Sequence, residues 1–123
     1  MKLIKILIIV SVSLLFESCN GSDNKEVNSK TEKHNGITTS LFKVWGNCDM
    51  CKETIENSLK VKGIIDADWN VESKMMTVSY DDKLISLDSI QKNISSVGYD
   101  NETYKGNDLA YSELHTCCQY DRK

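Results

Sequence analysis

Residues 64–80, IIDADWNVESKMMTVSY, decide the fold that the sequence predicts. Apolar side chains alternate with polar ones on both sides of the turn Glu72–Lys74, which is the pattern of two half-buried strands joined as a hairpin. The residues that this alternation places toward a core are Ile65, Ala67, Trp69 and Val71 in the first strand, and Met76, Val78 and Tyr80 in the second. The hairpin therefore supplies two antiparallel strands of a sheet with one buried face.

A predicted helix lies on each side of this hairpin. In residues 51–62 the apolar side chains of Ile55 and Leu59 lie one helical turn apart, and Gly63 follows as a stop signal. Residues 87–97 have the three- and four-residue spacing of a helix with one apolar face. The residues of that face are Leu87, Ile90, Ile94 and Val97, between the capping candidate Ser86 and the terminating Gly98.

Two outer strands complete the pattern. Residues 40–45 predict the first, with Phe42 and Val44 on one face, and Tyr99–Lys105 predict a weaker last strand. The order over residues 37–105 is then βαββαβ. This order predicts an α+β, ferredoxin-like domain, in which a four-stranded antiparallel sheet carries two helices on one face.

The 123-residue chain is long enough for one such domain with appendages. Residues 1–18 predict a lipoprotein-type signal peptide, because two lysines precede an apolar run too short to span a bilayer. The stretch Leu15–Cys19 resembles a bacterial lipobox, so Cys19 is the predicted lipidation site that anchors the protein to a membrane of the cell envelope, facing the periplasm or in the outer membrane. Polar residues 19–36 predict a flexible tether, and residues 106–123 form a cysteine-containing tail.

The net charge and the motifs of the sequence argue against two classes of function, nucleic-acid binding and catalysis. The formal net charge is −3, whereas nucleic-acid binding relies on basic residues that meet phosphates. The sequence has no recognisable catalytic triad, paired-carboxylate site or phosphate-binding loop. We therefore predict a binding protein that is not an enzyme.

The chemistry lies in residues 46–51, GNCDMC, between the first strand and the first helix. Two residues between Cys48 and Cys51 let both sulfurs point at one centre. A helix start favours the thiolate, which is the form of cysteine that binds metal. Soft sulfur selects ions such as Cu(I) and Zn(II), and two thiolates suit Cu(I) better than structural zinc, which usually takes four ligands.

Spacing alone leaves two alternatives open for Cys48 and Cys51. In an oxidising compartment they could form a structural disulfide, or they could act as an extracytoplasmic thiol–disulfide redox module. The chain contains no proline, which weighs against a thioredoxin fold with its cis-proline beside the CxxC motif.

Residues 46–51, the helix after them and the Val97–Tyr99 end of the second helix together resemble the heavy-metal-associated domain family. That family includes copper chaperones, the mercury-binding periplasmic protein and the N-terminal modules of metal-pumping ATPases. The resemblance implies a ferredoxin-like fold, a metal ion on Cys48 and Cys51, and a metal-transporting ATPase or efflux component as partner. It also implies that Tyr99 lies behind the ligands, in a loop facing the site.

The tail carries a second pair, Cys117 and Cys118. Adjacent cysteines seldom bond to each other because the resulting ring is strained, so this pair is predicted to bind metal or to bond to other cysteines. If the tail folds back, Cys117 and Cys118 become additional ligands and shift the preference toward Zn(II) or Cd(II). The sequence favours Cu(I), bound and either passed on or scavenged outside the cytoplasm, with Zn(II), Cd(II) and Hg(II) as alternatives.

Overall fold

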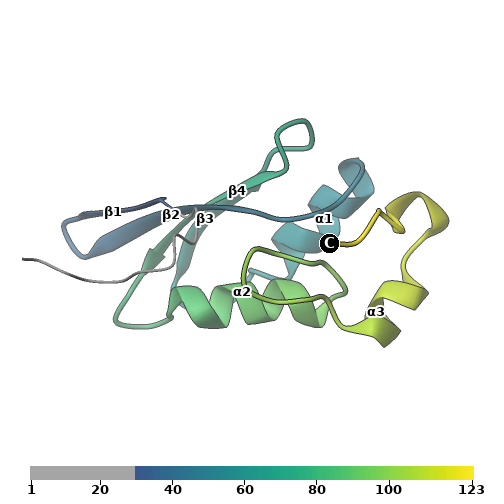
Figure 1. Cartoon of the computed structure of the whole chain (residues 1–123). Coiled ribbons are helices and arrows are strands. Elements are labelled where there is room, and N and C mark those ends of the chain that lie inside the picture. Colours follow the sequence, from purple (N-terminus) through teal and green to yellow (C-terminus); the bar gives the residue numbers. More distant parts are fainter. Residues whose placement is uncertain (1–29) are drawn as a thin grey trace, which may run out of the picture.

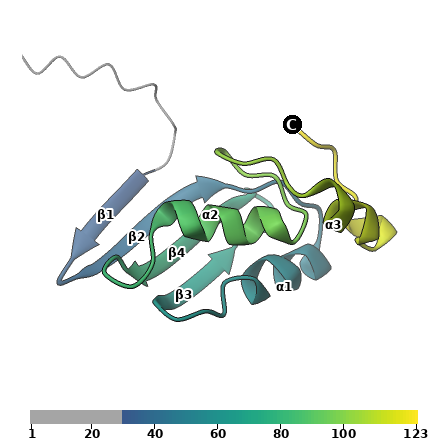
Figure 2. The same cartoon turned by 90° about the horizontal axis from the view of Figure 1, so that it is seen from below.

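The computed structural model describes residues 30–123, so the predictions for the signal peptide, for Cys19 and for most of the tether lie outside the described residues. A four-stranded antiparallel sheet, in the order β1-β2-β4-β3, carries α1 and α2 on one face (Figures 1 and 2). The elements are β1 Lys30–His34, β2 Ile37–Lys43, α1 Asp49–Asn57, β3 Ile64–Trp69, β4 Met75–Asp81, α2 Leu87–Ser96, α3 Asp108–Glu113 and the 3-10 turn Thr116–Cys118. The predicted α+β, ferredoxin-like class is confirmed.

The central hairpin forms as its alternation predicts, with one local difference. Trp69 pairs with Met76 and Ala67 with Val78, but the register shifts near Ile64. This bulge inserts an extra residue and turns Ile65 outward, so that its side chain is 56% exposed instead of buried.

The fourth strand is in a different place from the one predicted. Residues 99–105 make only an isolated bridge, between Asn101 and Val44. The fourth strand of the sheet is β1, which pairs with β2. The cause is local: the side-chain oxygen of Asn101 accepts the backbone N–H groups of Thr103 and Tyr104, which turns the chain away from the sheet.

The strand β1 lies inside the segment predicted to be a tether. Asn35 and Gly36 have positive φ angles of 50° and 81°, as a two-residue hairpin turn requires. An Asn-Gly pair favours this turn, so Lys30–His34 folds back on β2 although all five of its residues are exposed. The tether prediction is therefore wrong for residues 30–36.

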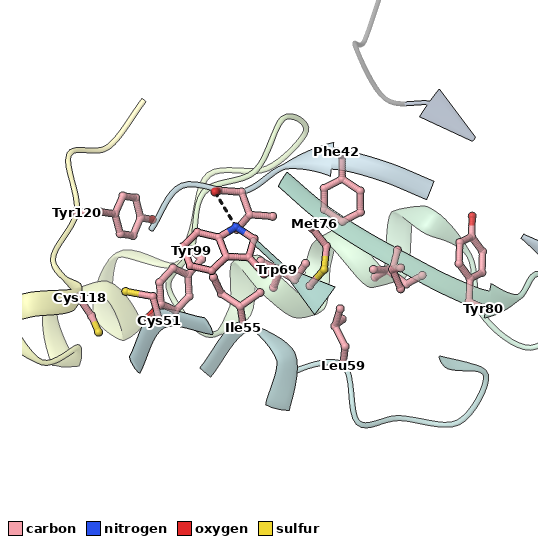
Figure 3. Packing of buried hydrophobic residues seen from close by; sticks show 14 residues of the cluster. Phe42, Cys51, Ile55, Leu59, Trp69, Met76, Tyr80, Tyr99, Cys118 and Tyr120 are labelled. Atoms are coloured by element: carbon pink, nitrogen blue, oxygen red, sulfur yellow. Dashed lines mark hydrogen bonds between the residues drawn. The ribbon is translucent and has the colours of Figure 1, made fainter. Parts of the chain in front are cut away.

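The core lies between the sheet and the helices (Figure 3). Trp69 is at its centre, and its Nε1–H donates to the carbonyl oxygen of Val44 at 3.1 Å. The other fully buried apolar side chains include Phe42, Ile55, Met76, Val78, Ile90 and Ile94. In residues 30–123 the longest helices fall well short of the length and apolarity needed to cross a bilayer.

The tail is part of this core and not a loose extension. It runs from α3 through the 3-10 turn to the C-terminus at the end of the domain where α1 begins (Figure 2). Cys118 and Tyr120 are each 3% exposed and pack in the same apolar cluster as Trp69. The tail therefore meets the loop that carries the CxxC motif.

Candidate metal centre

The CxxC motif lies where β2 leads into α1. Cys48 caps the start of α1, and Cys51 lies fully buried in its first turn. Their Sγ atoms are 3.8 Å apart, and the backbone N–H of Asn47 donates to Cys51 Sγ at 3.3 Å. The helix begins at Asp49 instead of the predicted Cys51, so both sulfurs lie at the helix N-terminus, where free N–H groups stabilise negative charge.

The electrostatics of the loop favour a thiolate on Cys48. The backbone N–H of Cys51 is the largest cause, and together with the N–H of Met50 it outweighs desolvation and lowers the pKa of Cys48 to about 7. A substantial fraction of Cys48 is then ionised at neutral pH. The thiolate is the form that attacks and binds a soft metal ion.

Gly46 makes room for the core beneath the loop. A Cβ atom at this position would lie 2.8 Å from the ring of Trp69, closer than such atoms approach. The bulky ring takes the space that a larger loop residue would need.

The structure brings the tail cysteines to the loop. Cys48 Sγ lies 3.9 Å from Cys117 Sγ and 3.9 Å from Cys118 Sγ, and the two tail sulfurs are 3.9 Å from each other. All four predicted cysteines are free thiols. Cys51 extends this triangle through its contact with Cys48, so the four sulfurs form one cluster.

Contacts that sequence reasoning did not find join the loop to the tail. The side-chain amide of Asn47 donates to the carbonyl oxygen of Cys117 at 3.2 Å, and Cys117 Sγ lies 3.6 Å from Met50 Sδ. These partners are far apart along the chain. No local spacing pattern could have paired them.

Tyr120 anchors the tail just after its cysteines. Its ring stacks on Tyr99, with centroids 5.6 Å apart, and meets the ring of Tyr111 edge-on at 5.2 Å. Its hydroxyl accepts the backbone N–H of Asp100 at 2.7 Å and donates to the carbonyl of Gly98 at 2.8 Å. The hydroxyl is thus satisfied inside the core, as buried phenols usually are.

An ion pair secures the end of the chain. Asp100 is fully buried and accepts from Arg122 Nη2 at 2.9 Å and from the N–H of Gly106 at 2.7 Å. Burial opposes ionisation of Asp100, but these donors and the N–H of Lys123 outweigh it and hold the pKa of the carboxyl below its usual value. The carboxylate is therefore charged and paired under neutral conditions.

Tyr99 lies fully buried beside Cys51 (Figure 3). Burial, followed by the nearby Cys51 and Cys118, raises the pKa of the Tyr99 phenol above its usual value. Its hydroxyl is buried and has no hydrogen-bond partner among residues 30–123. Burial likewise raises the pKa of the Cys118 thiol, so a metal ion must displace its proton.

Comparisons with known proteins cover the part of the chain that holds the CxxC motif. The heavy-metal-associated domain model matches residues 47–100. The chain is 33% identical over 55 residues to the copper chaperone CopZ of Staphylococcus aureus, covering 44% of this chain and 81% of that protein. It is 38% identical over 65 residues to a zinc-transporting ATPase of Synechocystis, covering 51% of this chain but only 9% of the ATPase.

Solved structures show the same likeness. A CopZ metallochaperone matches with a TM-score of 0.50 and 31% identity, over 51% of this chain and 97% of the other. The N-terminal domain of a potential copper-translocating P-type ATPase from Bacillus subtilis, solved in the Cu(I)-loaded state, matches with a TM-score of 0.50 and 26% identity, over 57% and 90%. On this fold, this cysteine loop and these relatives, the chain belongs to the heavy-metal-associated domain family.

Proposed function

We propose that this protein binds one soft metal ion, Cu(I) in preference, on Cys48 and Cys51 and passes it to another protein outside the cytoplasm. The observation that carries the proposal is the pair of sulfurs 3.8 Å apart at the N-terminus of α1, inside the segment that matches the family. Soft thiolate ligands select Cu(I) over hard ions.

The two sulfurs differ in a way that suits transfer. Cys51 is buried, whereas Cys48 is partly exposed and has the lowered pKa. An incoming ion would therefore meet the Cys48 thiolate first and the Cys51 sulfur second. An acceptor thiolate would approach from the same exposed side, and the ion would move by exchange of one sulfur at a time.

The setting and the partner come from sequence and similarity. The predicted lipid on Cys19 would hold the domain at a membrane of the cell envelope, on a polar segment that precedes β1. A metal-transporting ATPase or an efflux component is the proposed partner, and the likeness to parts of two ATPases supports it. The protein is proposed to have no catalytic activity of its own.

The test is an anaerobic titration of the reduced protein with Cu(I), and separately with Zn(II). We expect one Cu(I) per chain, and loss of tight binding in Cys48→Ser/Cys51→Ser. Asp49→Asn is the matched control, since this exposed residue lies between the cysteines and offers no sulfur. Unchanged Cu(I) affinity in Cys48→Ser/Cys51→Ser would overturn the proposal, and disulfide reduction without metal binding would replace it with the redox alternative.

A further inference from the structure

We infer that the tail completes the metal centre: Cys117 and Cys118 join Cys48 as ligands, with Cys51 beside them, so that one soft ion is held by three or four thiolates instead of two. This inference rests on the proposed function, because it concerns the same ion. The ion would then be enclosed by two segments of the chain, the CxxC loop and the tail.

The distances between the sulfurs carry the inference. Cys48, Cys117 and Cys118 form a triangle whose three sides are each 3.9 Å. The centre of such a triangle lies about 2.3 Å from every corner, which is the length of a metal–thiolate bond. An ion placed there would meet all three sulfurs without any movement of the chain.

A two-coordinate site would look different. Two sulfurs on opposite sides of one ion lie about 4.6 Å apart, whereas sulfurs of a tetrahedral site lie about 3.8 Å apart. The Cys48–Cys51 separation of 3.8 Å has the tetrahedral value. Cys48, Cys117 and Cys118 thus have the spacing of a three-coordinate site, and Cys51 lies beside them through its contact with Cys48.

The tail is positioned by contacts that do not involve its sulfurs. Tyr120 and Arg122 hold it from one side, and Gly106 packs so closely on Gly98 that an added Cβ would lie 2.5 Å from the carbonyl carbon of Gly98. These contacts bracket Cys117 and Cys118 on the chain. The two sulfurs are therefore presented to the loop by the fold itself.

The unpartnered hydroxyl of Tyr99 is an independent sign of a ligand. A buried phenol without an acceptor is unfavourable, and Tyr99 lies close to Cys51 and Cys118. A thiolate on either cysteine would accept a charge-assisted hydrogen bond from this group. The arrangement suits the loaded centre, in which the cysteines have lost their protons, better than the empty one.

The experiment counts sulfurs around Cu(I) in the reduced protein by X-ray absorption and measures the Kd by competition with a chromophoric Cu(I) chelator. We expect three or four sulfurs in the wild type and two in Cys117→Ser/Cys118→Ser, with a Kd weakened by about ten- to a hundredfold. Thr116→Ser, an exposed neighbour in the same turn, is the matched control and should change neither value.

Two sulfurs in the wild type, with the same Kd in Cys117→Ser/Cys118→Ser, would overturn the inference and leave the proposed function standing. Retained binding in Cys48→Ser/Cys51→Ser would overturn the proposed function instead. If the loss of the buried Cys118 unfolds the double variant, Cys117→Ser decides, because this side chain is exposed. It should lose one sulfur from the count, and an unchanged count would refute the inference.

Discussion

The two ends of this domain each carry a segment outside the family match, β1 at one end and the tail at the other (Figure 1). The two segments are held to the domain by different interactions. At one end β1 adds a strand that makes a regular hydrogen-bond ladder to β2 but buries none of its five residues. At the other end the tail has little regular structure, yet it buries Cys118 and Tyr120 in the core. The comparison indicates that burial, more than backbone hydrogen bonding, makes an added segment part of a domain.

The largest effect is expected from Tyr120→Ala at the tail end. The substitution removes a stacked ring, an edge-on ring contact and two buried hydrogen bonds, and should lower the free energy of unfolding by about 4 kcal/mol. Urea unfolding of the reduced protein measures this. Tyr120→Phe keeps the ring and should lose much less. A loss below about 1 kcal/mol in Tyr120→Ala would mean that the tail is not part of the core.

Asp100→Asn should come next, because it leaves Arg122 without its buried partner. We expect a loss of about 3 kcal/mol at neutral pH. The pH dependence has a definite sign. The pKa of Asp100 is lower in the folded state, so its stabilisation is complete above the unfolded-state pKa of about 3.9 and is lost as the pH falls toward the folded-state value.

Measuring the free energy of unfolding as a function of pH therefore separates the contribution of this ion pair from other causes of destabilisation. Below about pH 4 the wild type should approach the stability of Asp100→Asn, and the difference between the two should shrink. A difference that stays constant from pH 7 to pH 3 would show that Asp100 acts through packing alone.

At the other end, Gly36→Ala should have a smaller effect. Its φ of +81° disfavours a residue with a Cβ by about 1–2 kcal/mol, although the space around it is open. The Kd for Cu(I) should not change, because the β1–β2 turn lies far from the start of α1, which carries Cys48 and Cys51 (Figure 2). A weaker Kd for Cu(I) in this variant would show that the hairpin at one end affects the metal site at the other.

The smallest effect is expected from Tyr99→Phe, and its direction is the informative part. Removing a buried hydroxyl that lacks a partner should stabilise the metal-free protein by about 1 kcal/mol. The same change should weaken Cu(I) binding, since the thiolates lose a donor. Thermal unfolding with and without Cu(I) measures both signs, and a stabilised Cu(I) form would refute this role of Tyr99.

Local patterns predicted the central elements of the fold. Phe42, Val44, Trp69 and Met76 alternate as strand residues, and the structure buries each of them. Ser86 caps α2 as predicted, accepting the N–H of Ser89 at 3.2 Å. The exposure of Ile65 was not predicted. A bulge depends on how two strands pair, so the alternation within one strand does not reveal it.

The ends of the domain were harder to predict for different reasons. Asn35-Gly36 is a hairpin signal, but the polar residues around it suggested a tether. Asn101 carries the turn that displaces the predicted last strand, which only the hydrogen bonds of its side chain reveal. At the candidate site, the spacing of Cys48 and Cys51 identifies them as a pair. Their proximity to Cys117 and Cys118 depends instead on Tyr120 packing against Tyr99.

The anchoring of the tail by Tyr120 has a consequence for competition with free thiols. A ligand on the same chain acts at an effective concentration, which reaches the millimolar range even on a short flexible linker. Cys117 and Cys118, the proposed tail ligands, sit on a turn held in place on both sides, so a monothiol in solution would have to outcompete ligands already positioned at the ion. A protein that offers two thiolates together has the same advantage of tethering. The site would thus resist small thiols and yield its ion to a partner with a cysteine pair of its own.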